Sequence, residues 1–149
     1  GGLSGGFFSS GQVKRGVAAV KARKNAITIG SAIMLVSLST IAFYLNDLKD
    51  NAAAVIALIS AILFGFQFLI NNLQTLPSDY YNGKNVGIVS GLGGTAAVIG
   101  TIITTLLVPV ITKTSYSWFF ILGALVVPVA WICITFISSA KIKPNPTTV

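Results

Sequence analysis

The sequence predicts an all-α membrane protein, a bundle of transmembrane helices, and two features of it carry that prediction: hydropathy and the spacing of charge. Of the 149 residues, 54% are hydrophobic and only 9% are charged, and the mean hydropathy is +0.85. A soluble domain carries about 25% charged residues. Four uncharged runs, joined by short polar connections, are each long enough to cross a bilayer, which takes about 20 apolar residues.

The chain begins with an apolar, glycine-rich segment, residues 1–12, which is too short to span a membrane. We expect it to be the end of a transmembrane helix whose beginning lies outside this chain. Residues 13–26 are expected to form a basic cytoplasmic loop, because five of the ten Lys and Arg residues fall between Lys14 and Lys24. A short basic segment flanked by apolar sequence is typical of a membrane loop that touches anionic lipid, and it argues against nucleic-acid binding as the reason for the net charge of +7.

The four predicted transmembrane helices contain no charged residue. They cover residues 27–45, 52–76, 86–111 and 118–137. Because their connections are short, consecutive helices are expected to run antiparallel as neighbours. Proline lies inside the last two helices, and a membrane helix tolerates it where neighbouring groups satisfy the freed carbonyl.

Lysine and arginine set the expected orientation. If the basic loop is inside, eight of the ten basic residues lie inside, while Lys49 and Lys113 lie outside. The excess of positive charge on the cytoplasmic side then places the polar tail, residues 138–149, in the cytoplasm.

The predicted helix 52–76 carries three amides on one face. Gln67, Asn71 and Gln74 follow the spacing i, i+4, i+7, so they should share that face. An unpaired amide in hydrocarbon costs a few kcal/mol, so these side chains should meet a water-filled cavity or another helix. Amides donate and accept hydrogen bonds, which suits the hydroxyls of a sugar, but they also link helices to each other.

The end of this helix contains a helix-breaking proline, Pro77, and an acidic residue, Asp79. Pro77 is expected to stop the helix, since proline lacks an N–H and disfavours a helical residue before it. Asp79 has two interpretations. It caps a short following turn, or it pairs with Arg15, Arg23 or Lys24 of the basic loop and latches one state of a gate.

Small residues recur four positions apart along the predicted helix 86–111. The pairs are Gly87/Gly91, Ser90/Gly94 and Ala96/Gly100. Residues four apart lie on one helix face, so another backbone can approach closely there. The pattern fits static packing, and it also fits a sliding surface that lets the helix rock during transport.

Two stretches resemble transporters of the major facilitator superfamily. GGLSGGFFSSGQVKRGVAAVKARK resembles the glycine-rich, basic loop after the eighth helix, and its Arg15–Gly16 and Arg23–Lys24 look like those of the anion:cation symporter branch. Residues 64–103 are similar to the end of helix ten and the start of helix eleven in sugar-acid transporters of that branch. The matching positions are Asn72, Pro77, Asp79, Val86, Gly87, Ser90, Gly91 and Gly94. The resemblance covers nearly the whole chain, as about helices 8–12 of a partial major facilitator fold.

The resemblance implies the C-terminal part of a secondary transporter that moves organic anions, sugar acids such as hexuronates and aldonates, by proton-coupled alternating access. We expect contacts with that substrate at Gln67, Asn71, Asn72 and Ser90; the hydroxyl of Ser90 has its own helix backbone as an alternative partner. The expected membrane is the bacterial inner (plasma) membrane. Membrane lipids and the remaining N-terminal helices of the same protein would be the partners.

Residue types that the sequence lacks narrow the function further. Without histidine there is no obvious ligand for zinc or haem and no imidazole acid–base chemistry, so we expect no metal, no cofactor and no enzyme. No predicted span contains Asp, Glu, Lys or Arg, so a symporter would need its coupling and carboxylate-binding groups in helices outside this chain. The alternative function is a small membrane subunit or scaffold that packs against a partner protein.

Overall fold

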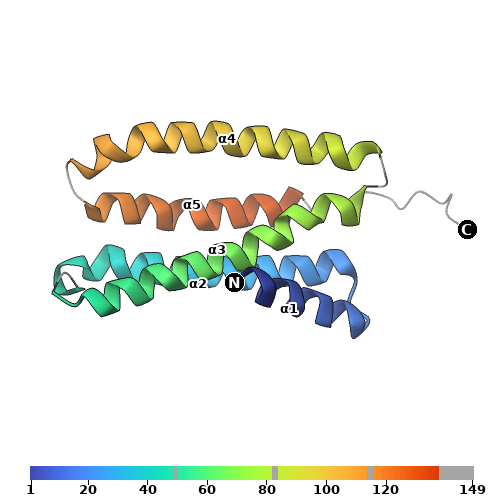
Figure 1. Ribbon diagram of the computed structural model, residues 1–149, viewed down its shortest axis with the longest axis horizontal. Helices are drawn as coiled ribbons and strands as arrows, with labels where there is room; N and C mark the ends of the chain where they lie inside the picture. The colour runs from blue at the N-terminus through green and yellow to red at the C-terminus, as the bar shows by residue number, and fades with distance from the viewer. Residues whose placement is uncertain (49, 82–83, 114–115, 138–149) are drawn as a thin grey trace, which may run out of the picture.

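The computed structural model describes residues 1–48, 50–81, 84–113 and 116–137, and every element in these ranges is an α-helix (Figure 1). The helices are α1 (Gly2–Lys14), α2 (Ala19–Leu48), α3 (Ala52–Tyr80), α4 (Lys84–Thr112) and α5 (Tyr116–Ile137). By length and composition, α2 to α5 can each cross a membrane. The predicted fold class, an all-α membrane helix bundle, is therefore confirmed. The expected tail, residues 138–149, lies outside the described residues.

The basic segment 13–26 is not a single loop, which corrects the prediction. α1 ends at Lys14 and α2 already begins at Ala19, so four of the five basic residues of the segment lie on a helix, three of them on α2. Gly16 makes the turn between the two helices with a φ of +87°, a left-handed conformation that glycine adopts without the steric cost of a Cβ. The early start of α2 fixes these basic side chains relative to the bundle.

Pro77 does not stop α3, and this prediction is also wrong. The helix continues to Tyr80, and the N–H of Tyr81 donates to the carbonyl oxygen of Pro77 at 2.9 Å. Proline removes only its own N–H bond, and here the chain closes one further turn beyond it. Asp79 therefore belongs to the last turn of α3 itself.

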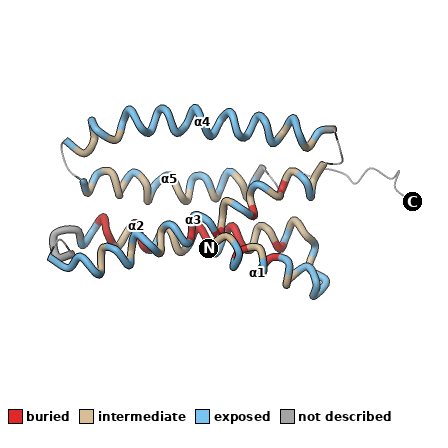
Figure 2. Tube along the Cα trace, viewed as in Figure 1, coloured by how far each residue is buried: buried red, intermediate tan, exposed pale blue. Residues whose placement is uncertain are grey.

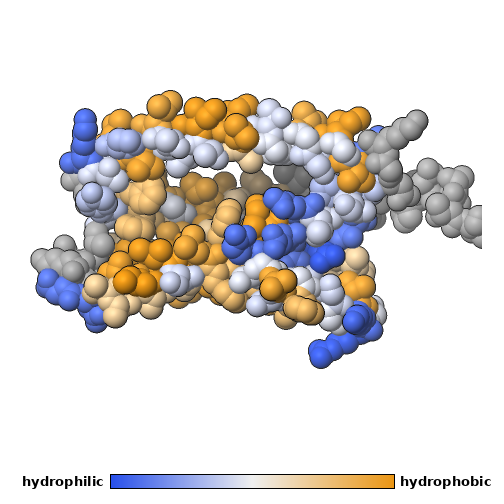
Figure 3. Space-filling model, in the orientation of Figure 1, coloured by the Kyte–Doolittle hydropathy of each residue, from blue (hydrophilic) through white to orange (hydrophobic). Residues whose placement is uncertain are grey.

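The helices form layers that share one charged end. Figure 1 shows α1, α2 and α3 together, α5 beside them and α4 outermost. The end of α1, the start of α2, the end of α3 and the start of α4 meet at one end, which we name the basic end after its residues Lys14, Arg15, Lys21, Arg23 and Lys24. Figure 3 shows hydrophilic residues at both ends of the bundle and over the second half of α3.

The buried residues lie along α2 and on the parts of α1 and α3 that meet it (Figure 2). The buried hydrophobic side chains all belong to α2 and α3: Ala22, Ala26, Ile27, Leu38, Ile41, Ala42, Phe68 and Leu76. On α4, by contrast, every residue from 90 to 107 is exposed. The described part of the chain thus has its core on one side and an uncovered apolar helix on the other.

The glycines that were expected to pack α4 make no close contact within the described part of the chain. A Cβ built on Gly87, Gly91, Gly94 or Gly100 would have nothing within 4 Å. Their role in helix packing stays a prediction, and it would need a helix that is not among those described here.

The closest approach of two long helices occurs instead at one glycine of α2 and one of α3. A Cβ on Gly30 would lie 2.7 Å from the carbonyl oxygen of Gly65, and a Cβ on Gly65 would lie 2.8 Å from the carbonyl oxygen of Gly30. The two backbones touch at this point, as small residues permit between membrane helices. This crossing fixes which residues of α2 and α3 face each other further along.

The substitution Gly65→Ala should destabilise the protein by roughly 1–3 kcal/mol, because the new methyl group would overpack the crossing. Thermal unfolding of the detergent-solubilised protein measures the effect. Gly11→Ala is the matched control, since a Cβ there has nothing within 4 Å and alanine favours a helix. Equal unfolding temperatures for the two variants would contradict the packing role of the glycine pair.

Candidate functional site

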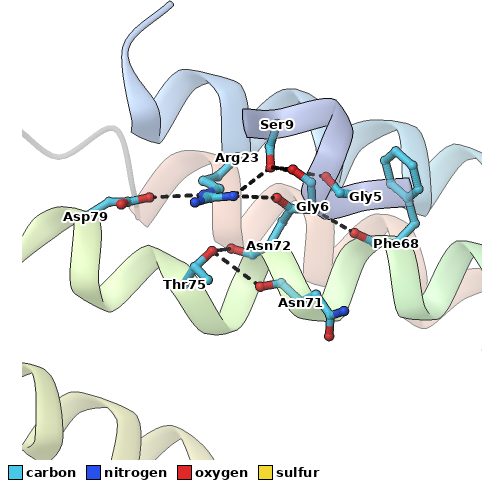
Figure 4. A network of polar contacts seen from close by, with 9 residues as sticks. All are labelled: Gly5, Gly6, Ser9, Arg23, Phe68, Asn71, Asn72, Thr75 and Asp79. Atoms are coloured by element: carbon cyan, nitrogen blue, oxygen red, sulfur yellow. Dashed lines mark hydrogen bonds and ion pairs between the residues drawn. The ribbon is translucent and has the colours of Figure 1, made fainter. Parts of the chain in front are cut away.

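Arg23 joins three helices at the basic end (Figure 4). From the first turns of α2, its Nε donates to Oδ2 of Asp79 on α3 at 3.3 Å. Its Nη1 donates to Oγ of Ser9 on α1 at 2.6 Å and to Oδ1 of Asn72 on α3 at 3.4 Å. We call these four residues the Arg23 cluster.

The two neutral members of the Arg23 cluster are themselves held in place. The hydroxyl of Ser9 donates to the carbonyl oxygen of Gly5 at 3.1 Å, and Nδ2 of Asn72 donates to the carbonyl oxygen of Phe68 at 2.9 Å. Ser9 is 0% exposed and Asn72 is 1% exposed. A buried polar network in which each group has a partner is rigid, because every rearrangement would leave one group unpaired.

The side chains of the ion pair in the Arg23 cluster are partly shielded from solvent, although Asp79 as a whole residue is exposed. The side chains of Arg23 and Asp79 are only 19% and 20% exposed. Shielding strengthens the attraction between the charges but makes the loss of either partner costly, since the other would stay desolvated and unpaired.

An open groove of 880 Å³ lies on the other side of α1, between α1 and α3. One wall is a face of α1 that includes Leu3, Phe7 and Ser10, and the other wall carries the amides of Gln67 and Asn71. We call this feature the α1–α3 groove. It offers hydrogen-bonding groups on one wall and apolar surface on the other, the combination that a sugar ring with hydroxyl groups requires.

The structure separates the four residues that were expected to contact substrate. Gln67 and Asn71 line the α1–α3 groove, whereas Asn72 is buried in the Arg23 cluster and does not open to the groove in this conformation. Consecutive helical residues point about 100° apart, so two adjacent asparagines take different surroundings. Ser90 is exposed on α4 and is not among the residues that line the groove.

The structure also places the residues expected at the gate in different surroundings. The structure pairs Asp79 with Arg23, one of the three candidates, while Arg15 is exposed in the turn between α1 and α2 and Lys24 is half-buried on α2. The pairing is a contact in one conformation. Its role in gating stays a prediction.

The contribution of α1 to this site was not predicted from the sequence. A Cβ on Gly5 would lie 2.7 Å from the carbonyl oxygen of Phe68, so α1 rests on the backbone of α3. The spacing of Gly1, Gly5 and Ser9, each four residues apart, is the signal that indicates such a contact. It brings the hydroxyl of Ser9 next to Arg23.

Two further hydrogen bonds between helices were also not predicted from the sequence. Nε1 of Trp131 on α5 donates to Oγ1 of Thr28 on α2 at 2.9 Å. Nδ2 of Asn25 on α2 donates to Oε1 of Gln12 on α1 at 2.9 Å. Both connect α2 to its neighbours within a few residues of Arg23, which makes α2 the common support of the basic end.

No family model, no curated protein and no solved structure matches this chain. Among the described residues, no group of three or more His, Cys, Asp or Glu side chains could hold a metal ion. The function is therefore argued from the Arg23 cluster, the α1–α3 groove and the sequence.

The substitution Arg23→Gln should destabilise the protein more than Asp79→Asn, because Arg23 donates to partners on two other helices. The expected loss for Arg23→Gln is about 1–3 kcal/mol, measured by thermal unfolding in detergent. The double variant should lose little more than Arg23→Gln alone, since the pair is then already broken.

Lys21→Gln is the control for that comparison, because Lys21 is an exposed base on the same turn of α2. We expect it to change stability by less than about 0.5 kcal/mol. Strictly additive effects of Arg23→Gln and Asp79→Asn would show that the two side chains do not act as a pair.

Proposed function

We propose that this chain is part of a secondary active transporter that moves organic anions, sugar acids such as hexuronates and aldonates, by alternating access. The observation that carries the proposal is the α1–α3 groove, to which Gln67 and Asn71 present their amides from a helix of membrane-spanning length. Exposed amides are costly against lipid. Along a water-filled path they have partners, and the hydroxyls of a sugar acid replace those waters in kind.

The proposed orientation places the basic end in the cytoplasm and the chain in the bacterial inner (plasma) membrane. The concentration of Lys and Arg at the junction of α1 and α2 supports it, since cytoplasmic loops of membrane proteins are enriched in these residues. In this orientation the α1–α3 groove lies on the cytoplasmic half of the bundle, beside the Arg23 cluster.

The Arg23 cluster is the proposed latch of the cytoplasmic gate. Alternating access requires helices to part at one end of the bundle while they close at the other. The Arg23–Asp79 pair connects α2 to α3, and the bond from Arg23 to Ser9 connects α2 to α1. A contact made of one ion pair and a few hydrogen bonds can break and re-form, so it biases the balance between two states without fixing either.

We include proton coupling in the proposal because the sequence resembles the anion:cation symporters. The spans that the structure describes carry no Asp or Glu between residues 27–44 of α2 or within residues 52–76 of α3. The proton-binding group would therefore belong to other helices of the same protein, which we propose as partners together with the membrane lipids.

A second candidate function is a membrane subunit or scaffold, and α4 is the observation that favours it. This helix is apolar, exposed at every residue from 90 to 107, and carries glycines with open space beside them. A helix of a partner protein could pack its backbone against such a surface.

Uptake by membrane vesicles that contain the full-length protein tests the leading proposal. Radiolabelled glucuronate, galactonate or gluconate should enter in a saturable manner, and a proton gradient should raise the rate. Glucose, which lacks the carboxylate, is the control. If none of the three anions is taken up, the transporter proposal fails and the subunit remains.

The substitution Asp79→Asn tests the latch. It should shift the balance of inward-open and outward-open states and change the transport rate several-fold, because it removes the charge that Arg23 contacts. Cysteine accessibility at the two ends of the bundle reports the balance, and Lys21→Gln serves as the control. Unchanged kinetics together with an unchanged balance would remove the latch.

A further inference from the structure

The α1–α3 groove contains one charged residue, Lys14, at the basic end of α1. Lys14 stands on the same wall as Leu3, Phe7 and Ser10, because the spacings of four, three and four residues keep them on one helix face. The side chains of Gln67 and Asn71 lie beside the other end of α1, where Gln67 is next to Gly1 and the amide of Asn71 is next to Gly2. The groove thus runs from an ammonium group to a pair of amides.

The two ends of the groove are too far apart for one small molecule to touch both. Twelve residues of helix separate Gly2 from Lys14, which is about 18 Å at 1.5 Å per residue. The long side chain of Lys14 shortens this distance by several ångström, and a hexuronate is still shorter than what remains. Lys14 and the amides therefore do not form one binding site, and a small molecule that moves along the groove would contact them one after the other.

The charge of Lys14 is available to a mobile anion. The chain has three acidic residues. Asp47 is in the last turn of α2 and Asp50 follows that helix, both at the opposite end, and Asp79 is paired with Arg23. Among the described residues, the structure gives Lys14 no acidic partner.

We infer that Lys14 is the capture residue at the cytoplasmic mouth of the α1–α3 groove, where it attracts the carboxylate of a soluble sugar acid before the hydroxyls reach Gln67 and Asn71. This inference rests on the proposed function and assigns the cytoplasmic mouth of its pathway. A lysine suits the task because its flexible, well-hydrated ammonium group attracts an anion without holding it in a fixed geometry. A positive charge at the mouth of a cleft raises the local concentration of anions and their rate of entry.

The other basic residues of this end do not share that position. Arg23 is occupied by the Arg23 cluster, and neither Arg15 nor Lys21 is among the residues that line the groove. Lys21→Gln therefore removes the same charge from the same end of the protein without changing the groove, which makes it the matched control for Lys14→Gln.

Transport from each side of the membrane tests the inference in vesicles that contain the full-length protein. With glucuronate offered on the cytoplasmic side, Lys14→Gln should raise KM by roughly tenfold and leave the maximal rate unchanged, because capture is slowed and the later steps are not. With glucuronate offered on the external side, KM should stay at the wild-type value. Lys14→Arg should restore the cytoplasmic KM, and added salt should reduce the difference between wild type and Lys14→Gln.

Several results would overturn the inference. They are an equal rise in KM for Lys14→Gln and Lys21→Gln, a rise on both sides of the membrane, or a loss confined to the maximal rate. The headgroup of an anionic lipid could also pair with Lys14, so the measurement is repeated in vesicles of phosphatidylcholine alone. There the effect should persist, and its disappearance would assign Lys14 to lipid. Failure of the wild-type protein to transport any sugar acid would refute the proposed function, whereas normal transport by Lys14→Gln refutes only the role of Lys14.

Discussion

The rest of the structure depends on the contact between the backbones of Gly30 and Gly65. Between membrane helices there is no hydrophobic driving force, since lipid is as apolar as the side chains, so close packing has to supply the attraction. Arg23 lies seven residues before Gly30 on α2, and Asn72 lies seven residues after Gly65 on α3. Seven residues are two turns, so in antiparallel helices the crossing brings these two side chains to the same level and face.

The same spacing carries the contact to the end of the bundle. Asp79 follows Asn72 by a further seven residues on α3, about 10 Å along the helix, and the long side chain of Arg23 spans this rise to place its Nε 3.3 Å from Oδ2 of Asp79. α1 then completes the arrangement by laying Gly5 on the backbone of α3 and offering the hydroxyl of Ser9. The register that one close crossing sets therefore accounts for an ion pair and a buried polar network that involve three helices.

Two adjacent residues of α3 have different roles, one in the buried network and one in the open groove. Asn72 faces inward to Arg23, and Asn71 faces the α1–α3 groove beside Gln67. Because α1 uses its small residues to contact α3, its larger residues are left for the wall of the groove. The buried network and the open groove are thus two sides of a single helix contact.

Hydropathy was sufficient to predict the fold class and the number of spans, because an uninterrupted apolar run of this length has few other uses. The ends of the helices were harder. Charge made residues 13–26 look like a loop, yet alanine, lysine and arginine are good helix formers, and α2 begins inside the segment. Pro77 looked like a terminus, although a helix can close one more turn beyond a proline.

The contents of the site were only partly predictable. Sequence narrowed the partners of Asp79 to three bases, but only the crossing of α2 and α3 selects Arg23. Repeated glycines drew attention to α4, whereas the contact that matters uses a single glycine on each of two helices, Gly30 and Gly65. Such a pair has no local pattern, because each half of it lies in a different part of the chain.

Pro77 has a mechanical consequence for the residue two positions after it. The missing N–H leaves the carbonyl of Leu73 without its usual helical donor, and a backbone hydrogen bond of this kind is worth about 1 kcal/mol. The terminal turn that carries Asp79 is therefore more compliant than the body of α3. A small swing of this turn displaces the carboxylate while Asn72, on the stiffer side of the proline, keeps its place.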